Sequence, residues 1–116
     1  MRDPSCLFCK IAAREIPAAI VHEDERLVAF RDIGPHAPVH VLVVPRDHVA
    51  SLDATDEGDQ GLLGALLSAA REIARAEGLS EDGYRTVINT GADGGQTVHH
   101  LHVHVLGGRS LGWPPG

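Results

Sequence analysis

The 116-residue sequence lacks long apolar runs, contains only two cysteines and has fewer basic than acidic side chains. No segment approaches the roughly 18 consecutive apolar residues of a membrane-spanning helix. Residues 1–4 do not resemble the apolar region of a signal peptide, so we expect a cytoplasmic protein without a membrane partner. Sixteen acidic and ten basic side chains give a net charge of −6. This charge argues against nonspecific binding to nucleic acid, which needs a basic face.

The length and composition are those of a small globular protein. A hydrophobic content of 43% is too high for a disordered chain. We therefore expect a single domain over residues 1–116, in which residues 107–116 form a C-terminal tail.

The two cysteines, Cys6 and Cys9, have the Cys-x-x-Cys spacing of a metal clip or a redox pair. A thioredoxin-like pair would follow a strand, whereas this pair begins a short helical pattern. Two unliganded cysteines are a third possibility. Zinc is the favoured interpretation, and it requires two further ligands.

The hydrophobic pattern predicts an α+β fold with about five mostly antiparallel strands, one long helix and a short N-terminal helix. Ser5 is the expected cap of the short helix, and Pro17 follows its end. The predicted helices cover residues 6–14 and 56–77, and the predicted strands lie in a hairpin over 20–30 and at 40–44, 85–89 and 100–106. The long helix should bury its apolar side, namely Leu62, Leu63, Leu66, Leu67, Ala70, Ile73 and Ala74.

The last predicted strand carries alternating histidines, His100, His102 and His104. On a strand they share one face at a spacing of about 7 Å, while the intervening apolar residues face the core. The glycine-rich stretch 91–95 before them could let the backbone approach a ligand closely. This face could be a solvated surface, a catalytic zinc site, or a nucleophilic histidine beside phosphate-binding groups. Spacing alone does not separate the last two.

The wider pattern resembles the histidine-triad (HIT) nucleotide-binding family over residues 5–116. The matching segments are Phe8-Cys9-Lys10-Ile11, Glu15-Ile16-Pro17-Ala18, Asp32-Ile33, Ala37-Pro38-Val39-His40, Asn89, Gly94-Gly95-Gln96-Thr97 and the histidine row. The ending Leu106-Gly107-Gly108-Arg109, with Trp113-Pro114-Pro115-Gly116, is similar to the Hint branch, the nucleoside phosphoramidases. The resemblance implies the HIT-like fold.

The resemblance also implies catalytic roles. His102 would be the nucleophile that carries a nucleotidyl group, His104 would bind the phosphate, and His40 would orient the nucleophile or relay protons. Three neutral donors would contact phosphate oxygens or the departing amine: Asn89, Gln96 and Thr97. A buried structural histidine is the alternative for His40, and loop capping is the alternative for the three donors.

For the nucleoside, the resemblance implies that Asp32 binds the two ribose hydroxyls. A turn-forming aspartate is the alternative. The base would lie among apolar side chains that could equally belong to the core: Phe8, Ile11, Ile16, Phe30, Ile33 and Leu42. In HIT proteins with a cysteine pair, a structural zinc is held by four residues that correspond here to Cys6, Cys9, His48 and His100.

We therefore expect an enzyme that hydrolyses purine nucleoside phosphoramidates of the AMP-amide type, with no organic cofactor. The alternatives are a dinucleoside polyphosphate hydrolase and a nucleotide-binding regulatory protein with incidental hydrolysis. The resemblance also implies a homodimer in which the tail around Trp113 reaches the partner's site. A tail that folds on its own subunit is the other possibility. His22 and His36 are interpreted as surface residues, and His99 has no assigned role.

Overall fold

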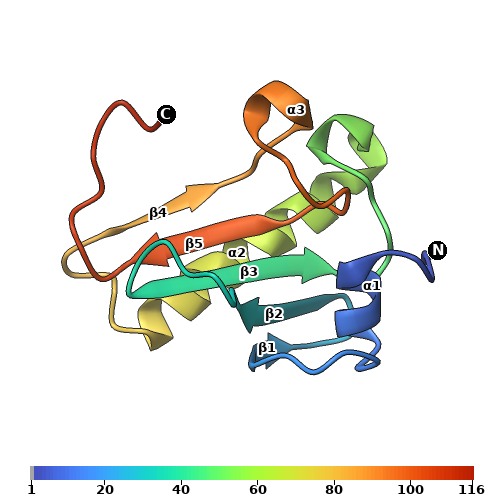
Figure 1. Ribbon diagram of the computed structural model, residues 1–116, viewed down its shortest axis with the longest axis horizontal. Coiled ribbons are helices and arrows are strands. Elements are labelled where there is room, and N and C mark those ends of the chain that lie inside the picture. The colour runs from blue at the N-terminus through green and yellow to red at the C-terminus, as the bar shows by residue number, and fades with distance from the viewer. Residues whose placement is uncertain (1) are drawn as a thin grey trace.

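The computed structural model describes residues 2–116, which form the predicted α+β fold around one antiparallel sheet with the strand order β1-β2-β3-β5-β4 (Figure 1). The strands are β1 (Ile20–Glu23), β2 (Leu27–Arg31), β3 (Val39–Pro45), β4 (Tyr84–Val87) and β5 (Val103–Gly107). The helices are α1 (Leu7–Ala12), α2 (Gln60–Ala76) and the single turn α3 (Gly91–Gly94), with short 3-10 turns at Leu52–Ala54 and Glu57–Asp59. The fold predicted from the sequence is confirmed.

Strands β3 and β5 form the centre of the sheet. They pair antiparallel with Val41 opposite Val105 and Leu42 opposite His104. The β-branched run in β3 suits this position because both of its faces are covered. The pairing brings residues that are at least 60 positions apart in the sequence into direct contact.

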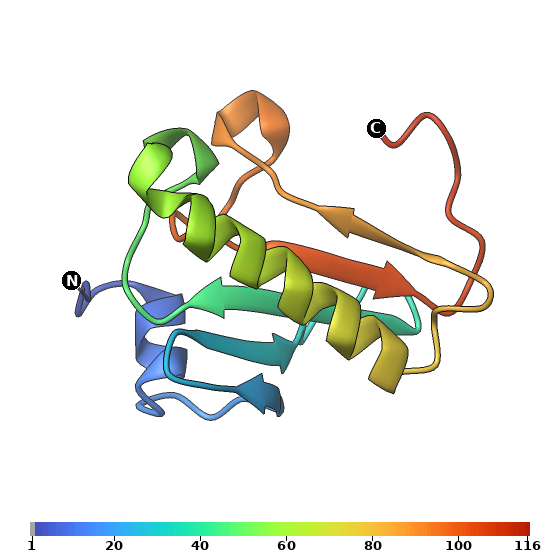
Figure 2. The same ribbon diagram turned by 180° about the vertical axis from the view of Figure 1, so that it is seen from behind.

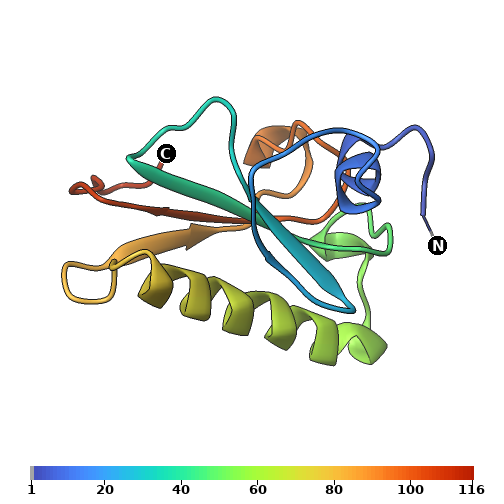
Figure 3. The same cartoon turned by 90° about the horizontal axis from the view of Figure 1, so that it is seen from below.

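Helix α2 covers one face of the sheet along its length (Figures 2 and 3). The buried side of α2 packs against the valines of β3 and β5 that point toward the helix. It consists of Leu66, Ala70, Ile73 and Ala74. The prediction for Leu67 is wrong, because 49% of its surface is exposed. Leu67 lies about 100° around the helix from Leu66, which turns it away from the sheet.

The other face of the sheet carries α1, which lies on the opposite side from α2 (Figure 3). Phe8 and Ile11 pack against Phe30, Leu42 and Val44 in a second core cluster. The Phe8 and Phe30 rings meet edge to face at a centroid distance of 5.4 Å. The site described below lies on this face.

Several element boundaries differ from the prediction. Helix α1 is capped by Cys6, whose Sγ accepts a hydrogen bond from the backbone N–H of Cys9, whereas Ser5 bonds to Asp3. Helix α2 starts at Gln60, after a 3-10 turn with a capping box. Strand β5 begins only at Val103. Residues 91–94 form a helical turn and not an open loop.

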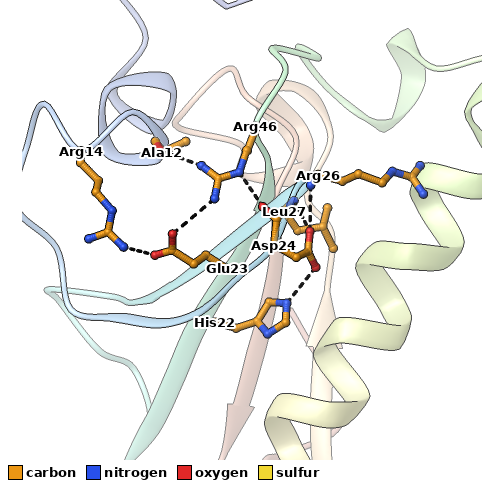
Figure 4. A network of polar contacts seen from close by, with 8 residues as sticks. All are labelled: Ala12, Arg14, His22, Glu23, Asp24, Arg26, Leu27 and Arg46. Carbon is orange, nitrogen blue, oxygen red and sulfur yellow. Dashed lines mark hydrogen bonds and ion pairs between the residues drawn. The ribbon is translucent and has the colours of Figure 1, made fainter.

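Arg46 fixes α1 to the β1–β2 hairpin at the end of β3 (Figure 4). Its guanidinium donates to the carbonyl oxygens of Ala12 at 3.1 Å and Asp24 at 2.7 Å. Glu23 lies 3.5 Å from the same guanidinium and also pairs with Arg14. Since Ala12 ends α1, this network holds the C-terminal end of the helix that carries both cysteines.

Candidate functional site

The histidine row lies along the side of the sheet that α1 covers. His104 is opposite Leu42 in the β3–β5 register, and Leu42 belongs to the α1 cluster. The Phe8 ring contacts both His100 and His102, at centroid distances of 5.9 and 5.1 Å. Leu101, Val103 and Val105 point to the α2 core. The predicted alternation of faces is therefore present, although His100 and His102 precede the paired part of β5.

The hydrogen bonds of His102 define its tautomer. Its Nδ1 lies 2.7 Å from the carbonyl oxygen of His100. A carbonyl can only accept, so Nδ1 carries the proton and donates it. In the neutral ring Nε2 then holds an unprotonated lone pair, which is the form that a nucleophilic imidazole requires.

His40 and His104 form a second hydrogen-bonded pair. The backbone N–H of His36 donates to His40 Nδ1 at 3.1 Å, so the proton of the neutral His40 ring lies on Nε2. His40 Nε2 donates to His104 Nδ1 at 2.9 Å. His104 Nε2 then carries a proton that it can donate to a ligand.

This order of protons bears on a possible metal site at His40 and His104, which differs from the zinc site of three histidines considered for the row. Asp32, His40 and His104 do place three potential ligand atoms close together. However, a metal on His40 Nε2 would require the proton to move to Nδ1, where it would face the N–H of His36. The arrangement therefore favours a hydrogen-bonding role for this pair over metal coordination.

Burial keeps both of these rings neutral. Burial, followed by the proximity of His102 and His40, lowers the pKa of His104 to about 4. Burial also lowers the pKa of His40, and Asp32 opposes that shift. At neutral pH both rings therefore act as neutral hydrogen-bond donors.

Two cavities meet at His102 and His104. The first has a volume of about 310 Å³ and is mainly apolar. It is lined by all the residues expected around the nucleoside, and also by Leu7, Pro17, Ala18, Arg31 and Val98, which the sequence did not identify. The expected residues are Phe8, Ile11, Ile16, Phe30, Asp32, Ile33 and Leu42.

The second cavity, of about 390 Å³, is open on the other side of the two histidines. His40, Asn89 and Thr97 line it, together with Val87 and Leu106. Thr97 lines both cavities, so this residue lies near their junction. Thus one reacting group between the cavities could contact His102, His104 and Thr97 together.

Gln96 differs from the other predicted phosphate ligands. Its side-chain amide donates to the carbonyls of Ala50 and Val98, and its oxygen accepts from the N–H of Gly91. The residue is buried and lines neither cavity. These contacts favour the loop-capping alternative for Gln96.

Asp32 lies at the junction of the two cavities. Its Oδ1 accepts from the N–H of Gly34 at 2.8 Å, which is the turn geometry of the alternative interpretation. Its Oδ2 lies 3.5 Å from His40 Nε2. The turn therefore aims a carboxylate oxygen at the site, so the two interpretations are compatible.

Cys6, Cys9, His48 and His100 form a compact cluster beside the start of α1. Their four ligand atoms all lie within 4.8 Å of one another. His100 Nδ1 is 3.3 Å from Cys6 Sγ and 3.5 Å from Cys9 Sγ, and His48 Nδ1 is 3.5 Å from Cys9 Sγ. A tetrahedral zinc with ordinary Zn–S and Zn–N bonds separates sulfur and nitrogen by about 3.6 Å. The donor set and its spacing fit zinc.

The tautomer of His100 also fits a metal ligand. Its Nε2 lies 2.8 Å from the carbonyl oxygen of Pro45 and so carries the proton, which leaves Nδ1 free toward the thiols. Burial lowers the pKa of His100 to about 4. Burial also raises the pKa of the Cys9 thiol, so metal binding must displace that proton.

Of the remaining histidines, His22 and His99 line neither cavity, whereas His36 lines the second cavity beside His40. His22 pairs with Asp24 at 3.0 Å, and His99 is exposed. His36 is exposed as predicted, but its N–H contacts His40, a contact that the sequence does not reveal. Trp113 is 82% exposed and therefore does not pack closely on its own subunit. None of the helices over residues 2–116 is long and apolar enough to cross a membrane.

Comparison with known proteins identifies relatives along nearly the whole chain. The chain is 60% identical over 110 residues to a HIT-like protein of Synechococcus elongatus, covering 95% of this chain and 96% of that protein. It is 50% identical over 116 residues to a 14 kDa zinc-binding protein of Zea mays, covering 98% and 90% respectively.

Solved structures give the same result. A HIT family hydrolase from Legionella pneumophila matches with a TM-score of 0.95 and 53% identity, over 97% of this chain and all of that one. A histidine triad protein from Clostridium difficile matches with a TM-score of 0.94 and 42% identity, over 97% of both chains. The model of the HIT domain matches residues 13–111. The chain therefore belongs to the HIT domain family.

Proposed function

We propose that this protein is a purine nucleoside phosphoramidase of the Hint branch, which hydrolyses the P–N bond of AMP-amide substrates. The observation that carries the proposal is the 2.7 Å contact of His102 Nδ1 with the His100 carbonyl, which leaves Nε2 of the neutral ring without a proton at the junction of an apolar and a more open cavity. The apolar cavity would hold the nucleoside, and the second cavity would hold the amine. The relative from Legionella pneumophila described as a HIT family hydrolase supports a hydrolytic reaction.

In the first step His102 Nε2 attacks the α-phosphorus and the P–N bond breaks. The amine leaves with the bonding electron pair and takes up a proton from solvent, and a nucleotidyl group remains on His102. The ring becomes an imidazolium, whose Nδ1–H stays hydrogen-bonded to the carbonyl oxygen of His100. His104, through Nε2–H, donates to the phosphoryl oxygens on which charge develops.

In the second step water attacks the phosphorus and the P–N bond to His102 breaks. The nucleoside monophosphate is released and Nε2 regains its lone pair, while the proton of the water goes to solvent. His40 holds His104 in the required tautomer through the 2.9 Å hydrogen bond. One difficult displacement is thus divided into two easier ones.

Asp32, Asn89 and Thr97 would bind the rest of the substrate. The carboxylate of Asp32 accepts from the two ribose hydroxyls at the mouth of the apolar cavity. Thr97 and Asn89 are neutral donors for phosphate oxygens or the departing amine. The apolar walls would pack against a flat ring without forming hydrogen bonds to its polar atoms, so several purines should be accepted.

We also propose a structural role for zinc at the Cys6, Cys9, His48 and His100 cluster. Four protein ligands complete a tetrahedral shell and leave no open position for substrate. When bound, the ion would tie α1 to the segment that carries His102. The zinc-binding relative from Zea mays supports the identity of the metal.

A cytoplasmic, single-domain homodimer is the proposed form of the protein. The exposed Trp113 supports a tail that contacts another subunit.

The function is tested by measuring kcat/KM for an AMP-amide and for a dinucleoside polyphosphate with the same enzyme. Faster turnover of the AMP-amide is expected. Faster cleavage of the polyphosphate would instead assign the second HIT activity. Tight AMP binding with negligible turnover of both substrates would indicate a nucleotide-binding regulatory protein.

A further inference from the structure

The turn after β5 is clamped against the loop that precedes β3. Arg109 donates from Nη2 to the carbonyl oxygen of His36 at 2.7 Å. Next to it, Gly108 has φ of 93°, and a Cβ on this residue would lie 2.8 Å from Cβ of Pro38. A side chain at Gly108 would therefore push the turn and the loop apart. The close approach and the Arg109 contact thus occur at the same junction of turn and loop.

His36, whose carbonyl accepts from Arg109, also controls the tautomer of His40. On one side of its Cα, His36 donates its N–H to His40 Nδ1 at 3.1 Å. On the other side, its carbonyl accepts from Arg109. The guanidinium thus holds the backbone on which the proton order of His40 and His104 depends.

From this arrangement we infer that Arg109 is a positioning residue for the His40–His104 pair and acts through the backbone of His36. Its loss lets the loop around His36 move, which weakens the contact with His40 Nδ1. The His40 ring can then adopt the other tautomer or rotate, and His104 Nε2 no longer carries a donor proton in every molecule. The kinetic consequence rests on the proposed function, whereas the tautomeric consequence does not.

A matched control is available in the same tail. Arg85 on β4 donates to the carbonyl of Gly112 at 2.7 Å and so holds the tail without touching the His36 loop. Arg109→Ala and Arg85→Ala each remove one guanidinium that binds a backbone carbonyl. Only Arg109→Ala should affect His40.

The test uses the zinc-loaded full-length protein and two measurements. Imidazole ¹⁵N spectra, recorded without substrate, report which nitrogen of His40 and His104 carries the proton. Steady-state kinetics on an AMP-amide report kcat and KM separately. For Arg109→Ala we expect a shift of the His40 nitrogen resonances toward a mixture of tautomers and a fall in kcat of about three- to tenfold with little change in KM.

Arg109→Lys should show a smaller spectral shift and a smaller fall in kcat than Arg109→Ala, because an ammonium can still donate to the carbonyl of His36. Arg85→Ala should leave the His40 spectrum unchanged. Thermal melts verify that each variant is folded at the temperature of measurement.

The inference is overturned if folded Arg109→Ala has the His40 spectrum of the unaltered protein, or if Arg85→Ala changes that spectrum equally. It is also overturned if the tautomer changes while kcat of an active enzyme does not. If the unaltered protein lacks phosphoramidase activity, the proposed function fails, and the spectra still decide the tautomeric role of Arg109.

Discussion

Removal of zinc from the Cys6, Cys9, His48 and His100 cluster is expected to lower thermal stability strongly and the reaction rate only weakly. In the proposed structural role the ion would bind the folded protein and join α1 to the segment before β5, two elements that are more than 90 residues apart. The Nε2 of His102, which we propose as the nucleophile, is not part of the cluster. Its position depends on the carbonyl of His100 and on contact with Phe8, which the core also supports.

The size of the effect follows from binding linkage. Zinc at 100 times its dissociation constant stabilises the folded state by about 2.7 kcal/mol. In a domain of this size, about 1 kcal/mol shifts Tm by about 4 °C, so chelation should lower Tm by about 10 °C. Calorimetry of protein with and without a chelator measures this change.

Activity is assayed at 25 °C, below both melting temperatures, where chelation should reduce kcat by less than about tenfold. Cys9→Ser should abolish the effect of zinc on Tm, because it removes a ligand. Ser5→Ala is the control, since its hydroxyl bonds to the carboxylate of Asp3 and not to one of the four cluster side chains. Loss of all turnover on chelation, with Tm unchanged, would contradict this reasoning and indicate a catalytic metal.

Three further predictions concern stability and nucleoside binding. First, the pKa of His104 is about 4 in the folded state and near 6.5 in an unfolded chain, so the unfolded state binds more protons between these pH values. The free energy of unfolding should therefore fall as the pH decreases from 6.5 to 4. Urea melts should show a smaller fall for His104→Asn. Second, Leu66→Ala should cost about 2–5 kcal/mol in urea melts because this side chain is 1% exposed, while the matched Leu67→Ala should cost under about 1 kcal/mol; equal costs would contradict the described packing of α2. Third, Asp32→Asn should weaken AMP binding about tenfold in titration calorimetry and remove the preference for AMP over its 2′-deoxy analogue; an unchanged affinity would exclude the ribose contact.

The parts of the fold that follow from local pattern could be predicted. The apolar run of β3 and the helical spacing of α2 specify their own structure. The start of β5 could not be predicted in this way. The alternation of polar and apolar residues continues through residues 100–102, but the pairing with β3 ends at Val43 opposite Val103.

The candidate site shows the same division. His102, His104 and Asp32 were assigned roles from their motifs, and the structure brings them together at the two cavities. The contacts of Gln96 with the Ala50 carbonyl and of Arg109 with the His36 carbonyl join distant backbone segments. No local pattern encodes such contacts, because they depend on how loops meet after the sheet has formed.

The double role of the second core cluster, in the core and in the cavity lining, could be identified only from the structure. Phe8 and Ile11 have the appearance of ordinary core residues in the sequence, and they are buried against Phe30 and Leu42. The same side chains line the apolar cavity. Their two roles coincide because the cavity is the unfilled part of the layer between α1 and the sheet.

The most direct test of the mechanism is to identify the residue that carries the nucleotide during turnover. The protein is mixed with an AMP-amide labelled in its phosphate, quenched within one turnover and analysed by peptide mass spectrometry under conditions that preserve phosphoramidate bonds. The mechanism predicts an adenylyl group on His102 and complete loss of both the adduct and P–N cleavage in His102→Gly. An adduct on another residue, or undiminished cleavage by His102→Gly, would contradict it.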